Sequence, residues 1–291
     1  MAQKKKIWEA VIHGMFLVLG LITVGCVLLI TVYLVISGIP AIRKIGLGAF
    51  LTGKVWESTA AQPHYGILPF ILTSVYGTAG AIVLGVPIGF LTAVYLSKVA
   101  PKGVKRALNS AVSLLAGIPS VVYGLVGMLV LVPAIRKTLH LPDGASLLAA
   151  ILVLAVMILP SIINVSETAL RAVPHEYEEA SLALGATEME TSFRVVLPAA
   201  RSGVATAVVL GVGRAIGEAM AIIMVAGNVS NMPGLFTPVR FLTTGIVSGM
   251  AYAAVGSLYQ QALYSIALVL FLFIMLINVV LNLFIKKRKE D

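Results

Sequence analysis

The chain has 291 residues, of which 59% are hydrophobic and 11% are charged, with a net charge of +9 and a mean hydropathy of +1.02. A water-soluble domain cannot bury that much apolar side chain, so the composition excludes a soluble globular protein and indicates a membrane protein. The single cysteine, Cys26, excludes an intrachain disulfide.

Six apolar runs are long enough to cross the hydrocarbon core of a bilayer, which takes about 20 helical residues. They cover residues 14–36, 72–97, 107–133, 146–166, 203–227 and 262–285. The first run is longer than the apolar core of a signal peptide, about 7–15 residues, and no small-residue cleavage site follows it, so we expect a retained anchor. We therefore predict an all-α membrane protein with six transmembrane helices in one domain over residues 1–291.

The distribution of basic residues predicts which side of the membrane each segment faces. Six spans place both termini on one side, together with the polar segment 167–201. Fourteen of the 21 lysines and arginines lie on that side, within residues 1–6, 98–106, 167–201 and 286–289, and six lie on the other. Because lysine and arginine accumulate on the cytoplasmic side, we predict cytoplasmic termini and external segments at 37–66 and 228–261. This topology accounts for the basic charge, so we do not predict nucleic-acid binding.

Two charged residues, Arg214 and Glu218, interrupt the fifth apolar run. Counted from Gly203 at 1.5 Å per residue, Arg214 lies about 16 Å deep, near the middle of the bilayer. A charge there needs a partner or water. Glu218 is four residues further on and within reach on the same helix face, so the two side chains either neutralise each other or line a hydrated path for an anionic substrate.

Two glycine-rich segments approximate nucleotide-binding motifs without completing them. Residues 48–55 lack the hydroxyl residue that a phosphate-binding loop places on Mg²⁺, and residues 211–217 have one residue too many before the last glycine. A ridge for close helix packing explains the second segment better, because small residues recur every four positions at Gly203, Ala207, Gly211, Ala215 and Ala219. The four histidines lack metal-ligand spacing. We therefore predict no catalysis, cofactor or metal.

The polar segment 167–201 suits a helix that another protein holds. It contains the stretch EEASLALGATEMETSFRVVLPAAR, which is acidic where helices that rest on membranes are usually basic. This stretch resembles the cytoplasmic EAA loop of ABC importer permeases, which begins with Glu-Ala-Ala and continues with a glycine and a Leu-Pro pair at fixed spacing. The matching residues are Glu179, Ala180, Ser181 in place of the second alanine, Gly185, Val195 in place of isoleucine, Leu197 and Pro198.

This resemblance implies a type I ABC importer permease whose EAA loop docks on a separate ATPase subunit. Longer strings, among them LLAGIPSVVYGLVGMLVLVP and GVGRAIGEAMAIIMVAGN, resemble the C-type permease family of phosphate importers over most of residues 65–230. The likeness implies phosphate import, with Arg214 and Glu218 in the substrate pathway. It also implies a sister permease, an ATP-binding subunit dimer and an external phosphate-binding protein, in the cell membrane of a bacterium or archaeon.

Three alternatives remain open at this point. The first is an importer of another oxyanion such as molybdate or tungstate. The second is a carrier or channel that works without ATP, although such a protein needs no docking helix. The third is a membrane scaffold without a pathway, in which Arg214 and Glu218 only pair with each other.

Overall fold

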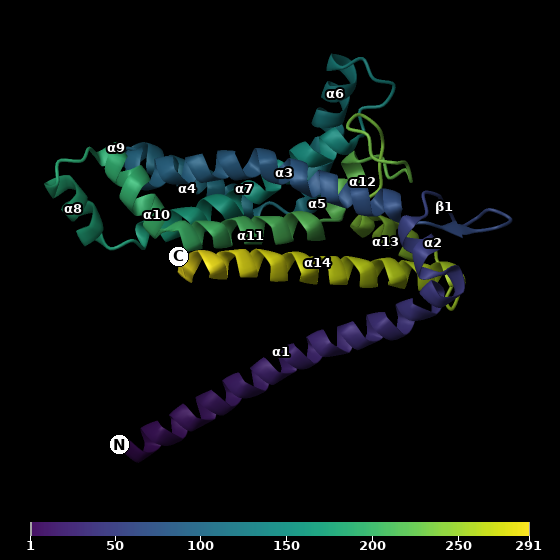
Figure 1. The fold of residues 1–291 in the computed structure, drawn as a ribbon, viewed down its shortest axis with the longest axis horizontal. Coiled ribbons are helices and arrows are strands. Elements are labelled where there is room, and N and C mark those ends of the chain that lie inside the picture. Colours follow the sequence, from purple (N-terminus) through teal and green to yellow (C-terminus); the bar gives the residue numbers. More distant parts are fainter. Residues whose placement is uncertain (1, 291) are drawn as a thin grey trace.

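The structure is a computed structural model that describes residues 2–290. It consists of helices and one short β-hairpin, and the long helices run along the long axis of the molecule (Figure 1). In chain order the elements are α1 (Ala2–Ile45), α2 (Leu47–Thr52), β1 (Trp56–Glu57), β2 (His64–Tyr65), α3 (Leu68–Val94), α4 (Lys102–Gly117), α5 (Ser120–Val126), α6 (Val132–Thr138), α7 (Leu147–Arg171), α8 (His175–Ala183), α9 (Glu188–Thr191), α10 (Leu197–Ala199), α11 (Arg201–Gly217), α12 (Met220–Val225), α13 (Leu242–Met250) and α14 (Leu258–Glu290). Three π-helical turns, Tyr95–Val99, Gly127–Leu131 and Ser192–Val196, continue α3, α5 and α9.

The predicted all-α membrane fold is confirmed. Within residues 2–290, five helical segments are long and apolar enough to cross a membrane, and α11 with the segment before it makes a sixth if a 69° bend is allowed. The five are Val11–Ile45, Leu68–Val99, Ser120–Thr138, Leu147–Arg171 and Leu258–Leu281. The helices α8 and α9 lie at one end of the bundle, and β1, α2 and α13 lie at the other (Figure 1).

Two predicted spans are not single helices. In the third, 107–133, the helix ends at Gly117 because Ile118 precedes Pro119 and takes an extended backbone, with ψ at 126°. A new helix then starts at Ser120, so the helical span runs over Ser120–Thr138 instead. In the fifth, 203–227, α11 ends at Gly217 and the chain turns at Glu218 before α12 begins.

Glycines allow α7 to pack closely against its two neighbours at the centre of the bundle. On α3, a Cβ added to Gly80, Gly85 or Gly89 would meet the side chain of Ile151, Ile158 or Ile162 of α7 within 3.0 Å. On α11, the predicted ridge of small residues faces α7 from Gly203 to Ala215, since Ala207 and Ala215 are buried and Gly211 abuts Ile162. The last predicted member, Ala219, lies beyond the end of α11 at Gly217 and is only half-buried. Close approach of backbones compensates for the weak hydrophobic drive between helices in lipid.

Gly203 offers a direct test of this packing. Its Cβ would lie 2.4 Å from the Cβ of Ala169, a methyl group with no rotamer freedom, so α7 and α11 would have to move apart. We expect Gly203→Ala to destabilise the protein by about 1–3 kcal/mol, as overpacking does elsewhere. Gly213→Ala on the same helix is the matched control, because nothing lies within 4 Å of its added Cβ. Thermal unfolding in detergent should rank the two variants, and equal midpoints would contradict the close contact.

An aromatic cluster closes the end of the bundle opposite α8. Trp56 and Tyr65 pair across the hairpin with ring centroids 5.3 Å apart, and Trp56 also packs against Phe70 and Tyr259. Arg240 stacks over the Phe70 ring and donates from Nε and Nη2 to the backbone oxygen of Asn228, at 3.0 and 2.6 Å. The predicted external segments 37–66 and 228–261 therefore meet in one ordered cap.

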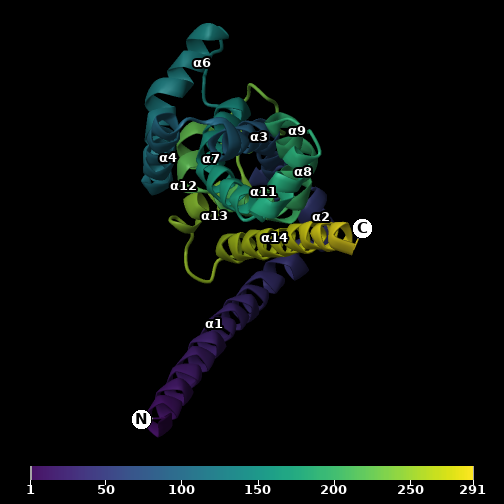
Figure 2. The same cartoon turned by 90° about the vertical axis from the view of Figure 1, so that its left-hand side faces the viewer.

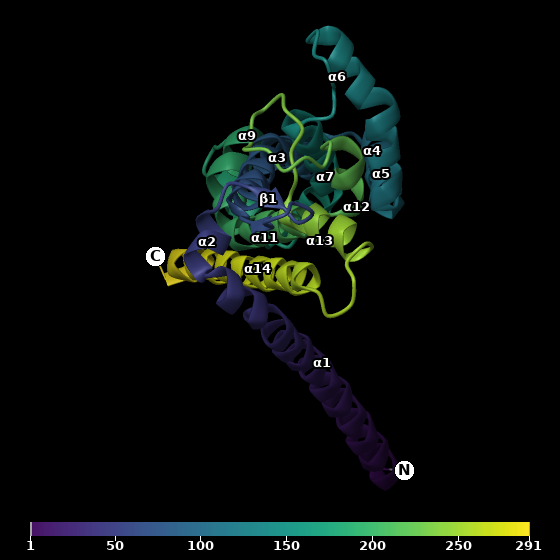
Figure 3. The ribbon, with the colours of Figure 1, turned by 90° about the vertical axis from the view of Figure 1, so that its right-hand side faces the viewer.

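The first helix leaves the bundle. Figures 2 and 3 show α1 diverging from the other helices toward its N-terminal end. Its C-terminal part is fixed to α14, where the Ser265 hydroxyl donates to the backbone oxygen of Gly38 at 2.6 Å and Tyr33 bonds to Tyr264 at 2.9 Å. None of its most apolar stretch is buried within the chain, so lipid or another subunit must cover it.

Candidate functional site

The predicted coupling segment, 167–201, forms the projecting end of the bundle. It contains the last turn of α7, then α8, α9, a π-helical turn and α10. Glu176 and Glu178 lie in the first turn of α8, where acidic groups complement the helix dipole. No residue of α8 is buried, and apolar side chains are exposed around it at Tyr177, Leu182, Leu184, Met189 and Phe193. A helix with no buried face is expected to gain its packing from a partner.

A glycine-dependent turn ends α8. Gly185 has φ at +86°, a backbone conformation that costs other residues free energy. Its N–H donates to the oxygen of Leu182 at 2.9 Å, and the N–H of Ala186 donates to the oxygen of Ser181 at 3.3 Å. This pair of bonds is the Schellman arrangement, in which a left-handed residue lets the last carbonyls of a helix be satisfied. The conformation explains why this position in the motif is a glycine.

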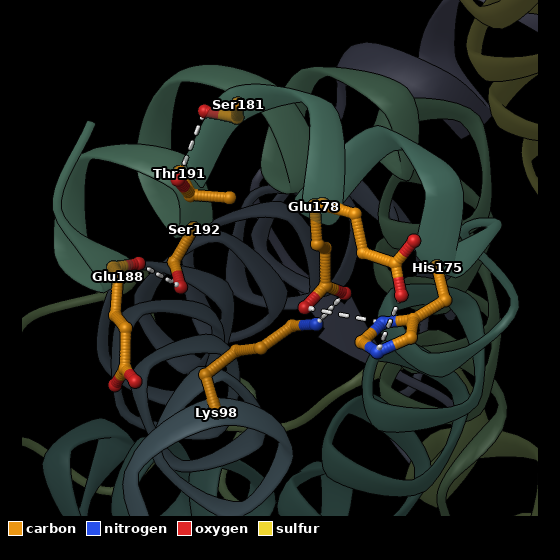
Figure 4. Close-up of polar contacts among 8 residues, drawn as sticks. Lys98, His175, Glu178, Ser181, Glu188, Thr191 and Ser192 are labelled. Carbon is orange, nitrogen blue, oxygen red and sulfur yellow. Dashed lines mark hydrogen bonds and ion pairs between the residues drawn. The ribbon is translucent and has the colours of Figure 1, made fainter. Parts of the chain in front are cut away.

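Side-chain hydrogen bonds fix α9 after the turn. The Thr187 hydroxyl accepts from the N–H of Glu190, and the Glu190 carboxylate accepts from the N–H of Thr187, which is a capping box. These bonds from Thr187 lower the pKa of the Glu190 carboxyl group below its ordinary value. The Ser181 and Thr191 hydroxyls are 2.9 Å apart, so α8 and α9 are tied together (Figure 4).

An ion pair connects α8 to the transmembrane bundle. Lys98, in the π-helical turn that ends α3, bonds to Glu178, and both residues are half-buried (Figure 4). His175 lies 3.9 Å from Glu178 and 3.8 Å from Glu179. At the base of the segment, Arg171 pairs with the buried carboxylate of Glu167. The ion pair therefore ties α8 to the end of the helix that begins as α3.

The residues of the EAA-type pattern fall into two groups in the structure. Glu179, Ala180 and Gly185 are exposed on α8 and its turn, while Ser181 is half-buried against Thr191. Val195 and Leu197 are half-buried, with Leu197 packed on the cluster of Ala93, Val94, Leu170 and Val196, and Pro198 is exposed. The first group lies mainly on the exposed surface of α8 and its turn, and the second lies where the segment joins the bundle.

Arg214 lies near the end of α11 that is remote from α8, half-buried, and its Nη1 is 3.3 Å from the Ser161 hydroxyl of α7. No carboxylate among the side chains that the structure describes lies within ion-pair distance of its guanidinium. A cation in an apolar helix without a protein counter-charge requires water or an anion. The arrangement therefore suits an anionic ligand.

Glu218 does not neutralise Arg214. The helix that would bring them together ends at Gly217, and Glu218 takes an extended backbone with ψ at 130°. Its carboxylate accepts from the N–H of Ala221 at 3.0 Å, which caps the start of α12, and its backbone oxygen accepts from the Thr243 hydroxyl at 2.7 Å. The predicted reach along one helix face is therefore wrong, because the fifth span breaks between the two residues.

Sequence reasoning missed three contributors to these sites. Ser161 follows Pro160 in an otherwise apolar run, and a hydroxyl there was a readable signal for a polar contact. Thr243, which holds Glu218, lies in a segment where no pattern distinguishes it. The pairing of Lys98 with Glu178 joins residues 80 positions apart and has no local signature.

Comparison with known proteins identifies relatives over most of the chain. The family described as "Binding-protein-dependent transport system inner membrane component" matches residues 85–289. The "Probable ABC transporter permease protein YqgH" of Bacillus subtilis is 41% identical over 266 residues, which are 89% of this chain and 86% of the relative. The "Phosphate transport system permease protein PstC" of Haemophilus influenzae is 34% identical over 285 residues, 90% of this chain and 88% of the relative.

Solved structures share the fold. A structure of the MetNI methionine ABC transporter in an inward-facing conformation covers 76% of this chain and 95% of its own, with a TM-score of 0.61 and 22% identity. A bacterial alginate ABC transporter covers 96% and 95%, with a TM-score of 0.59 and 18% identity. These similarities confirm the type I ABC importer permease fold predicted from the sequence.

Proposed function

Because this chain belongs to the binding-protein-dependent transport system inner membrane components, the permeases of ABC importers, we propose that it forms part of the path by which such an importer carries inorganic phosphate. The proposal combines three features: relatives named as phosphate permeases, an arginine suited to an oxyanion, and an exposed helix suited to an ATPase. The relatives indicate the substrate class, the arginine would bind the oxyanion, and the exposed helix would bind the ATPase.

The observation that carries the proposal is the uncompensated charge of Arg214. A guanidinium group offers a planar fork of N–H donors that matches the oxygens of phosphate, and it remains charged at any physiological pH. Ser161 holds one nitrogen, while no carboxylate in the described chain competes for the rest. Phosphate that leaves water loses hydration, and a fixed positive charge offsets part of that loss.

Coupling to ATP is assigned to α8 and the turn at Gly185. The exposed Glu179, Ala180 and Leu184 form the surface that an ATP-binding subunit would contact, and Leu184 is 90% exposed in the isolated chain. The ion pair of Lys98 with Glu178 would then carry the motion of α8 into the bundle. Hydrolysis of ATP is assigned to the partner, so this chain is a transport subunit and not an enzyme.

The remaining partners follow from the same assignment. A sister permease completes the path, and an external phosphate-binding protein docks at the end that carries β1 and α13. The predicted cytoplasmic side is the end of α8 and α9, and the N-terminal end of α1 and the C-terminal end of α14 lie toward that same end of the long axis (Figure 1). The family and the apolar helices place the chain in a cell membrane as a multi-pass protein.

Uptake of labelled phosphate tests the substrate assignment. In cells that lack only this subunit, we expect uptake to be lost and to return when the chain is supplied. Unlabelled phosphate should compete, whereas molybdate and tungstate at the same concentration should not. Competition by molybdate alone would replace phosphate with another oxyanion. Uptake that persists when the ATP-binding partner is deleted would favour an ATP-independent carrier.

A further inference from the structure

A line of polar side chains descends α7 from the Arg214 contact toward the cytoplasmic end. Ser161, Asn164 and Thr168 are spaced by three and four residues, which places them on one face of the helix. Ser161 is half-buried, and Asn164 and Thr168 are exposed, whereas the apolar side chains between them are buried or half-buried. The face therefore differs from the lipid-facing surface of a membrane helix, where apolar side chains are the rule.

Asn164 makes this face unsuitable for lipid. The Thr168 hydroxyl donates to the backbone oxygen of Asn164 at 2.8 Å, so threonine is satisfied within the helix. No hydrogen bond joins the carboxamide of Asn164 to the residues that the structure describes. An unpaired amide in hydrocarbon is strongly disfavoured, so this side chain needs water or a polar ligand.

The neighbouring helix presents polar groups on the same side. Arg214 crosses the seam between α11 and α7 to reach Ser161, which fixes the side of the seam on which both lie. Two further steps along this side of α11, toward its cytoplasmic start, is the exposed Thr206, and the apolar Leu210 lies between it and Arg214. Gly203 and Gly211 keep the two helices in contact behind it. The polar groups of α7 and α11 thus border one path along the contact between the two helices, which is called the lane below.

The charges around this lane favour an anion. Arg214 lies at one end, and the exposed Arg201 lies at the other, where α11 begins. Between these ends α7 contributes only neutral hydrogen-bonding groups, since Glu167 is buried and paired with Arg171. A channel with cationic ends and neutral donors raises the local concentration of anions.

We propose that Ser161, Asn164 and Thr168 form the inner half of the anion path, in which Ser161 positions Arg214 and Asn164 and Thr168 bond to the partly dehydrated oxyanion on its way to the cytoplasm. This inference rests on the proposed function, because it takes Arg214 as the point where the anion enters the seam. It extends the site from one charged residue to a row of neutral side chains on another helix.

Thiol labelling tests the lane independently of substrate identity. Cys26 is the single cysteine, so a Cys26→Ser parent provides a background for single thiols. In the assembled transporter in inside-out vesicles, a membrane-impermeant sulfonated thiosulfonate should modify Asn164→Cys and Thr168→Cys. Leu91→Cys is the matched control, since Leu91 is exposed and lies seven residues before Lys98, as Asn164 lies seven before Arg171. Because thiolate forms poorly in an apolar environment, we expect labelling of Asn164→Cys at least about tenfold faster than that of Leu91→Cys.

Phosphate should slow the labelling of Asn164→Cys, and equal rates for Asn164→Cys and Leu91→Cys would overturn the lane. The parent's own phosphate uptake separates the two proposals. If Asn164→Cys labels fast and the Cys26→Ser parent imports molybdate but not phosphate, the lane is supported and the phosphate assignment is wrong. A parent that imports phosphate but labels at the control rate would keep the function and remove the lane.

Isosteric charge change gives a second readout. Asn164→Asp keeps the side-chain shape but places a negative charge in the lane, and repulsion should lower uptake by about tenfold or more. Asn164→Gln keeps the amide and should retain most of the uptake. Ser161→Ala should raise the KM for transport, whereas Ser161→Thr, which keeps the hydroxyl, should have a KM near that of the parent. Normal uptake by Asn164→Asp, with normal amounts of assembled complex, would contradict the proposal.

Discussion

Replacement of Arg214 by glutamine is expected to abolish phosphate uptake while the permease still reaches the membrane and assembles. The charge is held by a hydrogen bond to Ser161 and has no carboxylate partner among the side chains that the structure describes. Its removal therefore leaves no buried anion unpaired in the protein. A unit charge 4 Å from an anion contributes about 4 kcal/mol at an effective dielectric constant near 20, which corresponds to a loss on the order of a thousandfold.

The lysine variant separates charge from geometry. Arg214→Lys keeps a positive charge but loses the planar fork and the fixed bond to Ser161. We expect uptake to fall by about 10- to 150-fold, because one well-placed charged hydrogen bond contributes about 1.5–3 kcal/mol. Lys102→Gln, at the exposed start of α4, is the control for a simple change in net charge and should retain most uptake.

The readouts are initial rates of labelled-phosphate uptake, normalised to the permease recovered with its ATP-binding partner. If Arg214→Gln transports at the parental rate, the residue serves packing alone and the substrate path lies elsewhere. If too little of the variant reaches the cell membrane, phosphate uptake is measured instead with the purified complex in liposomes. A stable but inactive variant is the expected result.

The fold was largely predictable from local sequence, and the reasons are physical. Apolar runs of membrane length must become helices in lipid, because no water is present to satisfy the backbone. Small residues every four positions on α11 likewise indicated the face that packs on α7, and Gly203 and Gly211 lie on it. These patterns depend only on short-range periodicity.

The errors arose where helices break. A proline at position 119 was visible, yet the sequence alone did not reveal whether it bends the third span or ends the helix. At Gly217 no proline is present, and the break is stabilised by contacts from distant residues, among them the hydroxyl of Thr243 on Glu218. The local separation of Arg214 from Glu218 was therefore outside the reach of a helical-wheel argument.

The coupling segment shows the same limit, because its motif could be read from the sequence whereas its contact with the bundle could not. The spacing of Glu179, Gly185 and Leu197 could be read directly, and the structure supplies a reason for the glycine in its left-handed backbone. The tie from Glu178 to Lys98 could not be read, because it depends on the approach of α8 to the end of α3. Local motifs identify the surface, while tertiary contacts determine how that surface is held.

A β-branched residue at position 185 should uncouple ATP hydrolysis from transport. With φ at +86°, a valine there is strained by at least about 1–2 kcal/mol, since its Cβ approaches the following carbonyl oxygen. Relief of that strain requires the two Schellman hydrogen bonds to Leu182 and Ser181 to break. Nothing lies within 4 Å of the added Cβ, so the effect comes from backbone conformation and not from crowding inside the chain.

The consequence is large because α8 has little else to hold it. No residue of α8 is buried, and its restraints are the Lys98 ion pair, the Ser181 to Thr191 hydrogen bond and its C-terminal turn. Loss of the turn lets the C-terminal end of α8 fray and displaces Leu184, whose side chain is 90% exposed. The assembled complex that carries Gly185→Val should therefore hydrolyse ATP at its ATP-binding subunits without importing phosphate, while the spans insert normally.

Gly185→Asn is the matched control, because asparagine adopts the left-handed conformation more readily than other residues with a side chain. In the reconstituted complex, the ratio of phosphate imported to ATP hydrolysed should stay near the parental value for asparagine and fall by about tenfold or more for valine, given the strain of about 1–2 kcal/mol at the contact surface. If the valine variant keeps the parental ratio of phosphate imported to ATP hydrolysed, the turn at Gly185 is not required for coupling. A fall for both variants would point to steric contact with the ATP-binding partner at this position, because only glycine would then fit beneath the partner's surface.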